Sequence, residues 1–261
     1  MDAVLHRGAR ANTSSDEKRL EEEREMLGFS KNYKGDIYNK KNQPPIIPEE
    51  DNVSLFITNL PAELAEDELL KGLISHGPFG KVYSVSMVPP DQSKGQTGAA
   101  AKLVMFTREA AEKVYGFIAG GGLKFHEKFN TRTAIVTWNQ VKHAAYDGQP
   151  WKSRVLTITG PKNVIDIESI ESALKSNIVY QTEQSRVLWE TITTRAIEWR
   201  FCSVLAQAEA ASLMFRRLDL PGVTVKYGLD PLDVPVAGKT QAAVTKTQDA
   251  WEKLGAWRRG L

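Results

Sequence analysis

The sequence predicts an α+β protein with two βαββαβ domains, each a four-stranded antiparallel sheet backed by two helices. Three observations predict this class. Between residues 52 and 233, short β-rich runs alternate with helical segments, and the order strand, helix, strand, strand, helix, strand occurs twice. The length of 261 residues accommodates two small domains, at roughly 100–200 residues each. The contents of 41% hydrophobic and 25% charged residues are typical of a folded globular protein.

The first domain is predicted to cover residues 52–142. Its first helix, Ala62–His76, carries leucines at helical spacing and acidic residues in its first turn, where the helix dipole favours them. Gly77, Pro78 and Gly80 end this helix. The other predicted elements are strands at Ser54–Leu60, Val82–Val88, Ala100–Phe106 and Thr133–Asn139, and a second helix at Thr107–Ala119.

The second domain is predicted to cover residues 153–233, after a polar linker at 143–152. Its two helices and the two helices of the first domain each cover one face of a sheet and leave the other face open, which is the ferredoxin-like arrangement. We expect function on an open face. The predicted elements are helices at Ile167–Leu174 and Ser203–Leu218, and strands at Arg154–Thr159, within Val179–Trp189, at Ala196–Phe201 and at Val223–Tyr227.

Two flanking segments lie outside these domains. Residues 1–51 are predicted to be a flexible arm, in which the charge-rich run Asp16–Met26 forms one short solvated helix. The tail, residues 234–261, is basic, with 5 basic and 2 acidic side chains, and it carries Trp251 and Trp257. A short amphipathic helix and an unstructured terminus are both compatible with this tail.

Several classes of protein are excluded by composition. No apolar run approaches the roughly 18 residues that span a bilayer, and the first ten residues lack the hydrophobic core of a signal peptide. We therefore expect an intracellular protein without a membrane partner, in the nucleus or the cytoplasm. A single cysteine and four scattered histidines provide neither a disulfide framework nor a metal cluster, so we expect no metal and no cofactor.

Catalytic motifs are missing from the sequence. The glycines at 120–122 are not followed by the Gly-Lys-Ser/Thr of a phosphate-binding loop. Neither a G-x-S-x-G nor an H-E-x-x-H pattern occurs. The acidic run Glu66–Glu68 lies in the first turn of a predicted helix, which is typical of solvated charge. We expect that the protein is not an enzyme.

The most specific motif is the run Leu55-Phe56-Ile57-Thr58-Asn59-Leu60. In a strand, Leu55 and Ile57 face one side, and Phe56 and Thr58 face the other. The run resembles the aliphatic-aromatic-aliphatic-x-Asn-Leu hexamer of RNA recognition motif (RRM) domains, and it matches every defined position. The resemblance implies that Phe56 lies on the open sheet and stacks on a base of single-stranded RNA. Burial of Phe56 by another segment is the alternative.

The third strand departs from the family pattern. RRM domains carry a K/R-G-F/Y-G/A-F-V-x-F/Y octamer there, which aligns with residues 99–106 when Phe106 is its last residue. The two outward aromatic positions then hold Ala101 and Leu103, and Lys102 points inward unless a bulge shifts the register. At about 1–3 kcal/mol per stacked base, two missing aromatics remove roughly 2–6 kcal/mol of binding free energy. We therefore expect weak to moderate RNA binding.

Side chains around the open face are expected to supply the remaining contacts. Lys94 precedes the third strand, and Arg132 lies at the start of the fourth. Trp138 shares a face of the fourth strand with Ala134 and Val136, which favours core packing over stacking. The expected RNA-binding residues are Phe56, Thr58, Leu103, Lys94, Arg132, Asn139, Gln140 and Lys142.

The second domain resembles the same family with a weaker motif. In Val155–Gly160 the aromatic position holds Leu156, and Thr159-Gly160 replaces Asn-Leu. Its third strand points Ala196, Glu198 and Arg200 outward, with no stacking aromatic. We interpret this domain as a degenerate copy suited to packing or protein contact. The resemblance covers residues 52–233, and the lead KGDIYNKKNQ is similar to that of RRM proteins of fungi.

A protein–protein interaction scaffold is the alternative function. Charge in the middle of the chain is close to balanced, with 10 basic and 9 acidic residues in 52–150 and 10 of each in 151–233. Some RRM-type domains bind a tryptophan of a partner protein with an Arg-x-Phe loop and an acidic first helix. Here the helix is acidic and the loop reads Leu123-Lys124-Phe125-His126, which is a partial match. The second domain and the tail are the expected surfaces for such a partner.

Overall fold

The computed structural model describes residues 14–27, 35–39, 46–126 and 131–234. The chain divides into two compact units, Met1–Pro48 and Glu49–Leu261. In the first unit, α1 (Ser14–Met26) covers the charge-rich run for which a helix was predicted, and Arg19 pairs with Glu23 one turn later. Residues 235–261 of the tail, for which a short amphipathic helix and an unstructured terminus were both left open, lie outside the described residues.

The second unit begins with a ferredoxin-like domain whose sheet has the strand order β2-β3-β1-β6, with all pairs antiparallel. Leu55, Ile57 and Leu60 alternate into the core and are fully buried there against leucines of α2. The elements are η1 (Glu49–Asp51), β1 (Ser54–Leu60), α2 (Glu66–Ile74), β2 (Val82–Val88), η2 (Gln92–Lys94), β3 (Ala99–Met105), α3 (Arg108–Ala119), a hairpin of β4 (Lys124–His126) and β5 (Thr131–Thr133), and β6 (Ile135–Trp138).

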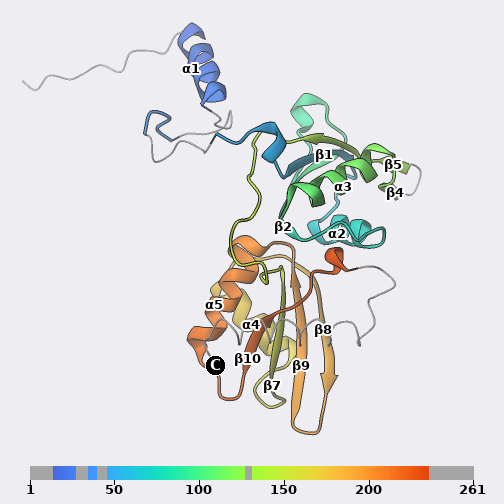
Figure 1. Ribbon diagram of the computed structural model, residues 1–261, viewed down its shortest axis with the longest axis vertical. Coiled ribbons are helices and arrows are strands. Elements are labelled where there is room, and N and C mark those ends of the chain that lie inside the picture. The colour runs from blue at the N-terminus through green and yellow to red at the C-terminus, as the bar shows by residue number, and fades with distance from the viewer. Residues whose placement is uncertain (1–13, 28–34, 40–45, 127–130, 235–261) are drawn as a thin grey trace, which may run out of the picture. The chain divides into compact units, whose positions relative to one another are not determined.

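A second ferredoxin-like domain follows, with the equivalent strand order β10-β7-β9-β8. Its core lies between the sheet and the helices α4 and α5, which cover one face of the sheet (Figure 1). The predicted fold class of two such domains is confirmed. The elements are β7 (Val155–Pro161), α4 (Ile167–Asn177), β8 (Thr182–Glu190), β9 (Thr194–Phe201), η3 (Val204–Ala208), α5 (Glu209–Leu218), β10 (Thr224–Tyr227) and η4 (Pro231–Asp233).

The predicted helix Ser203–Leu218 is shorter in the structure. Its first turn, η3, has extended backbone angles at Leu205 and a positive φ of 59° at Ala206, so the regular helix begins at Glu209. The reason is local to Ser203, whose side chain does not cap the helix. The Ser203 hydroxyl instead bonds the backbone of Val85 in the other domain.

Backbone and buried side chains join the two sheets within this unit. The carbonyl oxygen of Leu232 accepts hydrogen bonds from the amides of Phe79, at 2.8 Å, and Gly80, at 3.0 Å. Leu232 and Cys202 belong to the second half of the chain but are fully buried in the core of the first domain. The predicted boundaries at residues 142 and 153 therefore stay predictions, since everything from Glu49 onward forms one compact unit.

A buried ionic cluster lies at the same junction. Arg154 and Asp230 are fully buried and form an ion pair at 3.0 Å, and Glu183 contacts the same guanidinium. Burial alone disfavours the charged form, but the two carboxylates outweigh it and raise the pKa of Arg154 above its ordinary value. The Asp230 carboxylate also accepts the amide of Val82 at 3.0 Å, which connects the cluster to strand β2.

Candidate functional site

The face of the first sheet opposite its helices carries a row of four side chains, one from each strand. Phe56 on β1 lies directly opposite Thr137 on β6 and Lys102 on β3, and Lys102 lies opposite Ser86 on β2. Directly paired residues in antiparallel strands point to the same side, with Cβ atoms about 4.5–5.5 Å apart. We call Thr137, Phe56, Lys102 and Ser86 the central row. Phe56 is half-buried in it and keeps part of its ring accessible.

A second row lies two residues further along the strands. Thr58 pairs with Ile135, and Ala100 pairs with Val88. Ile135 is 56% exposed and Val88 is 45% exposed, so this upper row is accessible and largely apolar. The distance between the rows is about 7 Å, since each residue of a strand advances about 3.3 Å.

The third row, on the other side of the central row, is covered. Ser54 and Val104 point to the open face by their pairing, yet they are 0% and 1% exposed. The segment after β6 runs along this end of the sheet, where the amide of Val53 donates to His143 and that of Tyr146 donates to Phe106. Sequence reasoning did not anticipate that the segment after the fourth strand closes part of the face.

The position of Leu103 differs from the prediction. Leu103 pairs with Leu55 and is fully buried in the core, while Lys102 pairs with Phe56 and faces outward. The expected outward Leu103 and inward Lys102 are therefore wrong. The octamer was aligned one residue too late, because β3 ends at Met105 and not at Phe106. A shift of one residue exchanges the two faces of a strand.

The alignment was wrong because it took Phe106 as the last aromatic residue of the octamer. The Phe106 side chain is buried, it contacts the ring of Tyr146 with ring centroids 4.7 Å apart, and it does not belong to the core cluster of the first domain. In the corrected alignment the octamer covers residues 98–105. The two positions that carry stacking aromatics in RRM domains then hold Ala100 and Lys102. Phe56 is thus the aromatic residue of the central row.

Lys102 is the charged residue of the two accessible rows. Burial against the sheet lowers the pKa of its ammonium group. Within the described part of the chain, no hydrogen bond or ion pair involves its side chain. A half-buried ammonium group without a partner favours any ligand that supplies acceptor oxygens, because such a ligand restores the solvation that the group lost.

Arg132 lies at the rim of the face, beside the upper row. Its guanidinium group donates to the carbonyl of Thr97 at 3.2 Å and to the side chain of Asn59 at 3.4 Å. Asn59 has a positive φ of 59°, which asparagine tolerates, and donates to the carbonyl of Thr133 at 2.9 Å. The asparagine of the hexamer therefore ties the end of β1 to the hairpin that carries Arg132.

The remaining predicted residues differ in their availability. Asn139 donates to the hydroxyl of Ser54 at 3.1 Å and accepts the amide of Val141 at 3.1 Å, so it fixes the end of β6. Lys142 forms an ion pair with Glu49 at 2.8 Å, and Gln140 is exposed. Lys94 belongs to η2, but its side chain lies outside the described residues.

Trp138 lies on the helix side of the sheet. It pairs with Leu55, stacks in parallel on Tyr115 with ring centroids 5.2 Å apart, and has the Arg108 guanidinium 3.7 Å from its ring centroid. A nucleobase therefore has no access to this ring from the open face, and core packing of Trp138 is the correct interpretation.

On the second sheet, opposite charges on the open face neutralise one another. Glu198 lies between Arg186, at 2.9 Å, and Arg200, at 2.6 Å. Arg200 also approaches Glu183 at 3.5 Å, which links this pair to the buried cluster of Arg154. The connected network holds three arginines and three carboxylates, namely Arg154, Arg186, Arg200, Glu183, Glu198 and Asp230, and so carries no net charge.

Trp189 is an aromatic side chain on this second open face that sequence reasoning missed. It pairs with Ala196, which shares the face of Glu198, and it is 44% exposed. A bulge between Val187 and Trp189 inverts the alternation of β8, so counting residues along the strand gives the wrong face. The second domain therefore does carry an outward aromatic, on β8 and not on its third strand, β9.

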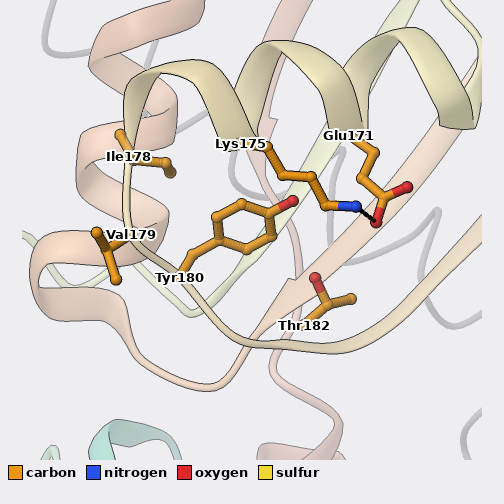
Figure 2. Close-up of a pocket in the computed structure, with 6 residues that line it drawn as sticks. All are labelled: Glu171, Lys175, Ile178, Val179, Tyr180 and Thr182. Carbon is orange, nitrogen blue, oxygen red and sulfur yellow. Dashed lines mark ion pairs between the residues drawn. The ribbon is translucent and has the colours of Figure 1, made fainter.

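Two shallow depressions lie away from the sheet faces. The first, of about 400 Å³, lies in the second domain between the end of α4 and the start of β8 (Figure 2). Figure 2 shows the ion pair of Lys175 with Glu171, at 2.8 Å, along its wall. The second, of about 470 Å³, lies between the start of α2 and the β4 hairpin and is lined by Pro61, Glu63, Leu64, Glu68, Lys71, Phe125 and His126.

The described residues were compared with what a metal site and a membrane-spanning helix require. Among them, no group of three or more histidine, cysteine, aspartate or glutamate side chains could hold a metal ion. Of the helices that the structure describes, none combines the length and the apolar character needed to cross a bilayer.

Comparisons with known proteins found similarity among solved structures only. No family model matches the chain, and no curated protein matches it. RNA recognition domains 1 and 2 of Sex-lethal from Drosophila melanogaster are 14% identical, with 67% of this chain and 99% of that chain covered and a TM-score of 0.24. RRM domains 1 and 2 of Prp24 from S. cerevisiae are also 14% identical, with coverages of 69% and 97% and a TM-score of 0.25. The RNA-binding domain of Hrp1, solved in complex with RNA, is 10% identical, with coverages of 69% and 98% and a TM-score of 0.22.

Proposed function

We propose that this protein binds single-stranded RNA, weakly to moderately, on the open face of the first sheet. The observation that carries the proposal is the central row, in which Phe56 of the hexamer stands accessible beside the unpaired cation Lys102. An aromatic ring on an exposed sheet stacks on an unpaired base, and a nearby cation adds attraction for a polyanion.

The proposed contacts follow from the positions of the accessible residues. Phe56 stacks on one base, and the hydroxyl of Thr58 in the upper row bonds the neighbouring nucleotide. Arg132 at the rim is placed for a phosphate, and Lys94, Gln140 and Lys142 supply contacts at the flanks. Leu103 does not contribute a contact because it is buried. Asn139 contributes indirectly, because its hydrogen bond to Ser54 holds β6 in place.

The affinity is expected to be modest for two reasons. One stacking ring contributes about 1–3 kcal/mol, whereas three rings are usual in the family that the sequence resembles. The covered third row also shortens the path of the RNA across the sheet. Few phosphates are then neutralised, so the electrostatic part of binding stays small.

Fluorescence anisotropy of the full chain with a random pool of labelled single-stranded RNA tests the proposal at two salt concentrations. We expect saturable binding that weakens with salt and that Phe56→Ala weakens by roughly 5- to 150-fold, the equivalent of losing one stacked base. Trp189→Ala is the matched control, because it removes an exposed aromatic from the other sheet. Equal effects of the two substitutions, or no effect of Phe56→Ala, would contradict the proposal.

A protein-binding scaffold is the second candidate, and the depression beside α2 favours it. Pro61, Leu64 and Phe125 form apolar walls, and Glu63 and Glu68 supply acidic groups at the same site. This combination suits an aromatic side chain within a basic peptide. The second domain and the C-terminal tail stay further candidates for a protein partner.

Calorimetry with a tryptophan-containing basic peptide tests this second candidate. We expect binding that Phe125→Ala abolishes and that Phe56→Ala leaves unchanged, since the two rings belong to separate sites. A peptide that binds equally to the wild type and to Phe125→Ala would contradict it.

A further inference from the structure

The polar side chains of the two accessible rows differ in whether they can accept a hydrogen bond. Thr137, Ser86 and Thr58 carry hydroxyl groups, which both donate and accept hydrogen bonds. Lys102 carries an ammonium group, which only donates. The other side chains of the two rows are apolar: Phe56, Ile135, Ala100 and Val88. Hydroxyl groups adapt to either kind of base edge, so Lys102 is the group in these rows that distinguishes acceptors from donors.

The placement of Lys102 directs it at the edge of a base. Its Cβ lies about 4.5–5.5 Å from that of Phe56, because the two residues are directly paired. A nucleobase stacked on Phe56 carries exocyclic groups that project beyond the phenyl ring, and Lys102 borders that ring on the side of β3. The lysine side chain is long enough to reach that edge without leaving the face.

The surroundings of Lys102 favour a base rather than a phosphate. Along β3 its neighbours on the same face are Ala100 and the fully covered Val104, so its aliphatic part is packed on apolar surface. Burial lowers the pKa of the ammonium group, and no carboxylate within the described residues compensates for it. Phosphates are strongly hydrated, and the guanidinium group of Arg132 lies at the rim of the same face.

Resting on the RNA-binding function proposed above, we propose that Lys102 reads the base stacked on Phe56 and selects the keto bases, guanine and uracil, over adenine and cytosine. Guanine offers the adjacent acceptors O6 and N7, and uracil offers O4. Adenine and cytosine place an amino donor at the equivalent position, and a second donor cannot bond to a donor-only side chain. Lys102 thus confers sequence preference at a position where RRM domains carry a stacking aromatic.

Anisotropy with two matched octamers of RNA, one of uridine and one of cytidine, tests this inference on the full chain. The two pyrimidines have the same size and differ at the O4 and N4 groups that Lys102 would read. We expect the wild type to bind oligouridine about tenfold more tightly, the order of magnitude of one hydrogen bond from a charged donor. Lys102→Met should bring the ratio close to one by weakening oligouridine binding, and Lys102→Arg should preserve the preference.

The control removes a positive charge elsewhere. Lys113 lies on α3 and pairs with Glu109 at 2.7 Å on the solvent side of the helix. Lys113→Gln should therefore leave the uridine-to-cytidine ratio unchanged. Thermal unfolding of each variant shows that the substitutions leave the fold intact, and Lys102→Met is expected to fold because it adds apolar surface to an apolar surrounding.

Three outcomes would overturn the inference, and they separate it from the proposed function. If binding depends on Phe56 but the two octamers bind equally well, the base preference is wrong and the RNA-binding face stands. If Lys102→Met weakens both octamers equally and reduces the salt dependence by about 0.7 in log–log slope, Lys102 contacts a phosphate instead. If no RNA binds, or if binding ignores Phe56→Ala, the proposed function fails and the inference fails with it.

Discussion

The hydroxyl oxygen of Ser203 bonds both backbone groups of Val85, the amide nitrogen at 3.1 Å and the carbonyl oxygen at 3.3 Å. Val85 belongs to β2, the edge strand of the first sheet. A serine of the second domain thus occupies hydrogen-bonding groups that a neighbouring strand would otherwise pair with. At Val85 these groups are therefore not free to pair with the strand of another chain.

Ser203→Ala is expected to destabilise the protein by about 1–3 kcal/mol, because it leaves a buried amide of β2 unsatisfied. Urea unfolding followed by circular dichroism measures this loss as a lower midpoint. Ser176→Ala is the matched control, since Ser176 is exposed on α4 and bonds only within its own helix. Its effect should stay within about 0.5 kcal/mol. Equal midpoints for the two variants would contradict the role of Ser203.

Arg154→Met is expected to cost about 3–5 kcal/mol of stability, because it leaves the buried carboxylate of Asp230 without its ion pair and that of Glu183 with Arg200 alone, at 3.5 Å. The triple variant Arg154→Met, Glu183→Gln, Asp230→Asn should be less destabilised than the single variant, since it buries no unpaired charge. The asparagine oxygen at position 230 can still accept the amide of Val82. Chemical denaturation of the three proteins measures the difference, and a triple variant less stable than Arg154→Met would contradict unpaired buried charge as the main cost.

Cys202 is expected to resist thiol reagents in the native protein. It is fully buried at the junction of the two domains, and burial raises the pKa of its thiol to about 12. On the order of one thiol in ten thousand is then ionised at pH 8, so reaction needs opening of the junction, which solvates the thiol and removes the cause of its raised pKa. Reaction with an aromatic disulfide reagent, followed by absorbance, should be slow in buffer and complete at one equivalent in urea.

Ser203→Ala should accelerate that reaction, because the serine adjacent to Cys202 holds the junction closed. The control variant Ser176→Ala should react as slowly as the wild type. Fast labelling of the unaltered native protein would contradict the closed junction.

The first strand shows how far local pattern determines this fold. The hexamer carries its own alternation, so its inward and outward residues were correct, and the strand and helix order followed from periodicity. The third strand is rich in alanine, with Ala99, Ala100 and Ala101 in succession, and such a run has no alternation to read. Only the pairing with β1 fixes its register, and that pairing is non-local.

Trp189 and Leu232 illustrate two further limits. The side of the sheet to which Trp189 points depends on a bulge, and no residue type in β8 predicts that bulge. Leu232 follows the last strand of the second domain and is buried in the first domain, where Phe79 and Gly80 bind its backbone. Contacts between segments about 150 residues apart are decided by tertiary packing, which composition and periodicity do not encode.

Glu198→Gln is expected to strengthen RNA binding. Glu198 neutralises part of the charge of Arg186 and Arg200 on the second open face. Without the carboxylate the network carries one net positive charge, and a longer RNA held by the first sheet gains a further phosphate contact. The log–log slope of affinity against salt should steepen by about 0.7, the value for one phosphate of a single strand.

Anisotropy with a 20-nucleotide single-stranded RNA over a salt series measures this slope. Glu171→Gln is the matched control, because it also removes one carboxylate from an ion pair, with Lys175 on α4, away from the open face. If both variants change the slope equally, the gain reflects total charge, and the second sheet face has no part in binding. If Glu198→Gln alone steepens it, the arginines that Glu198 neutralises in the native protein are positioned to meet RNA, and their pairing limits its affinity.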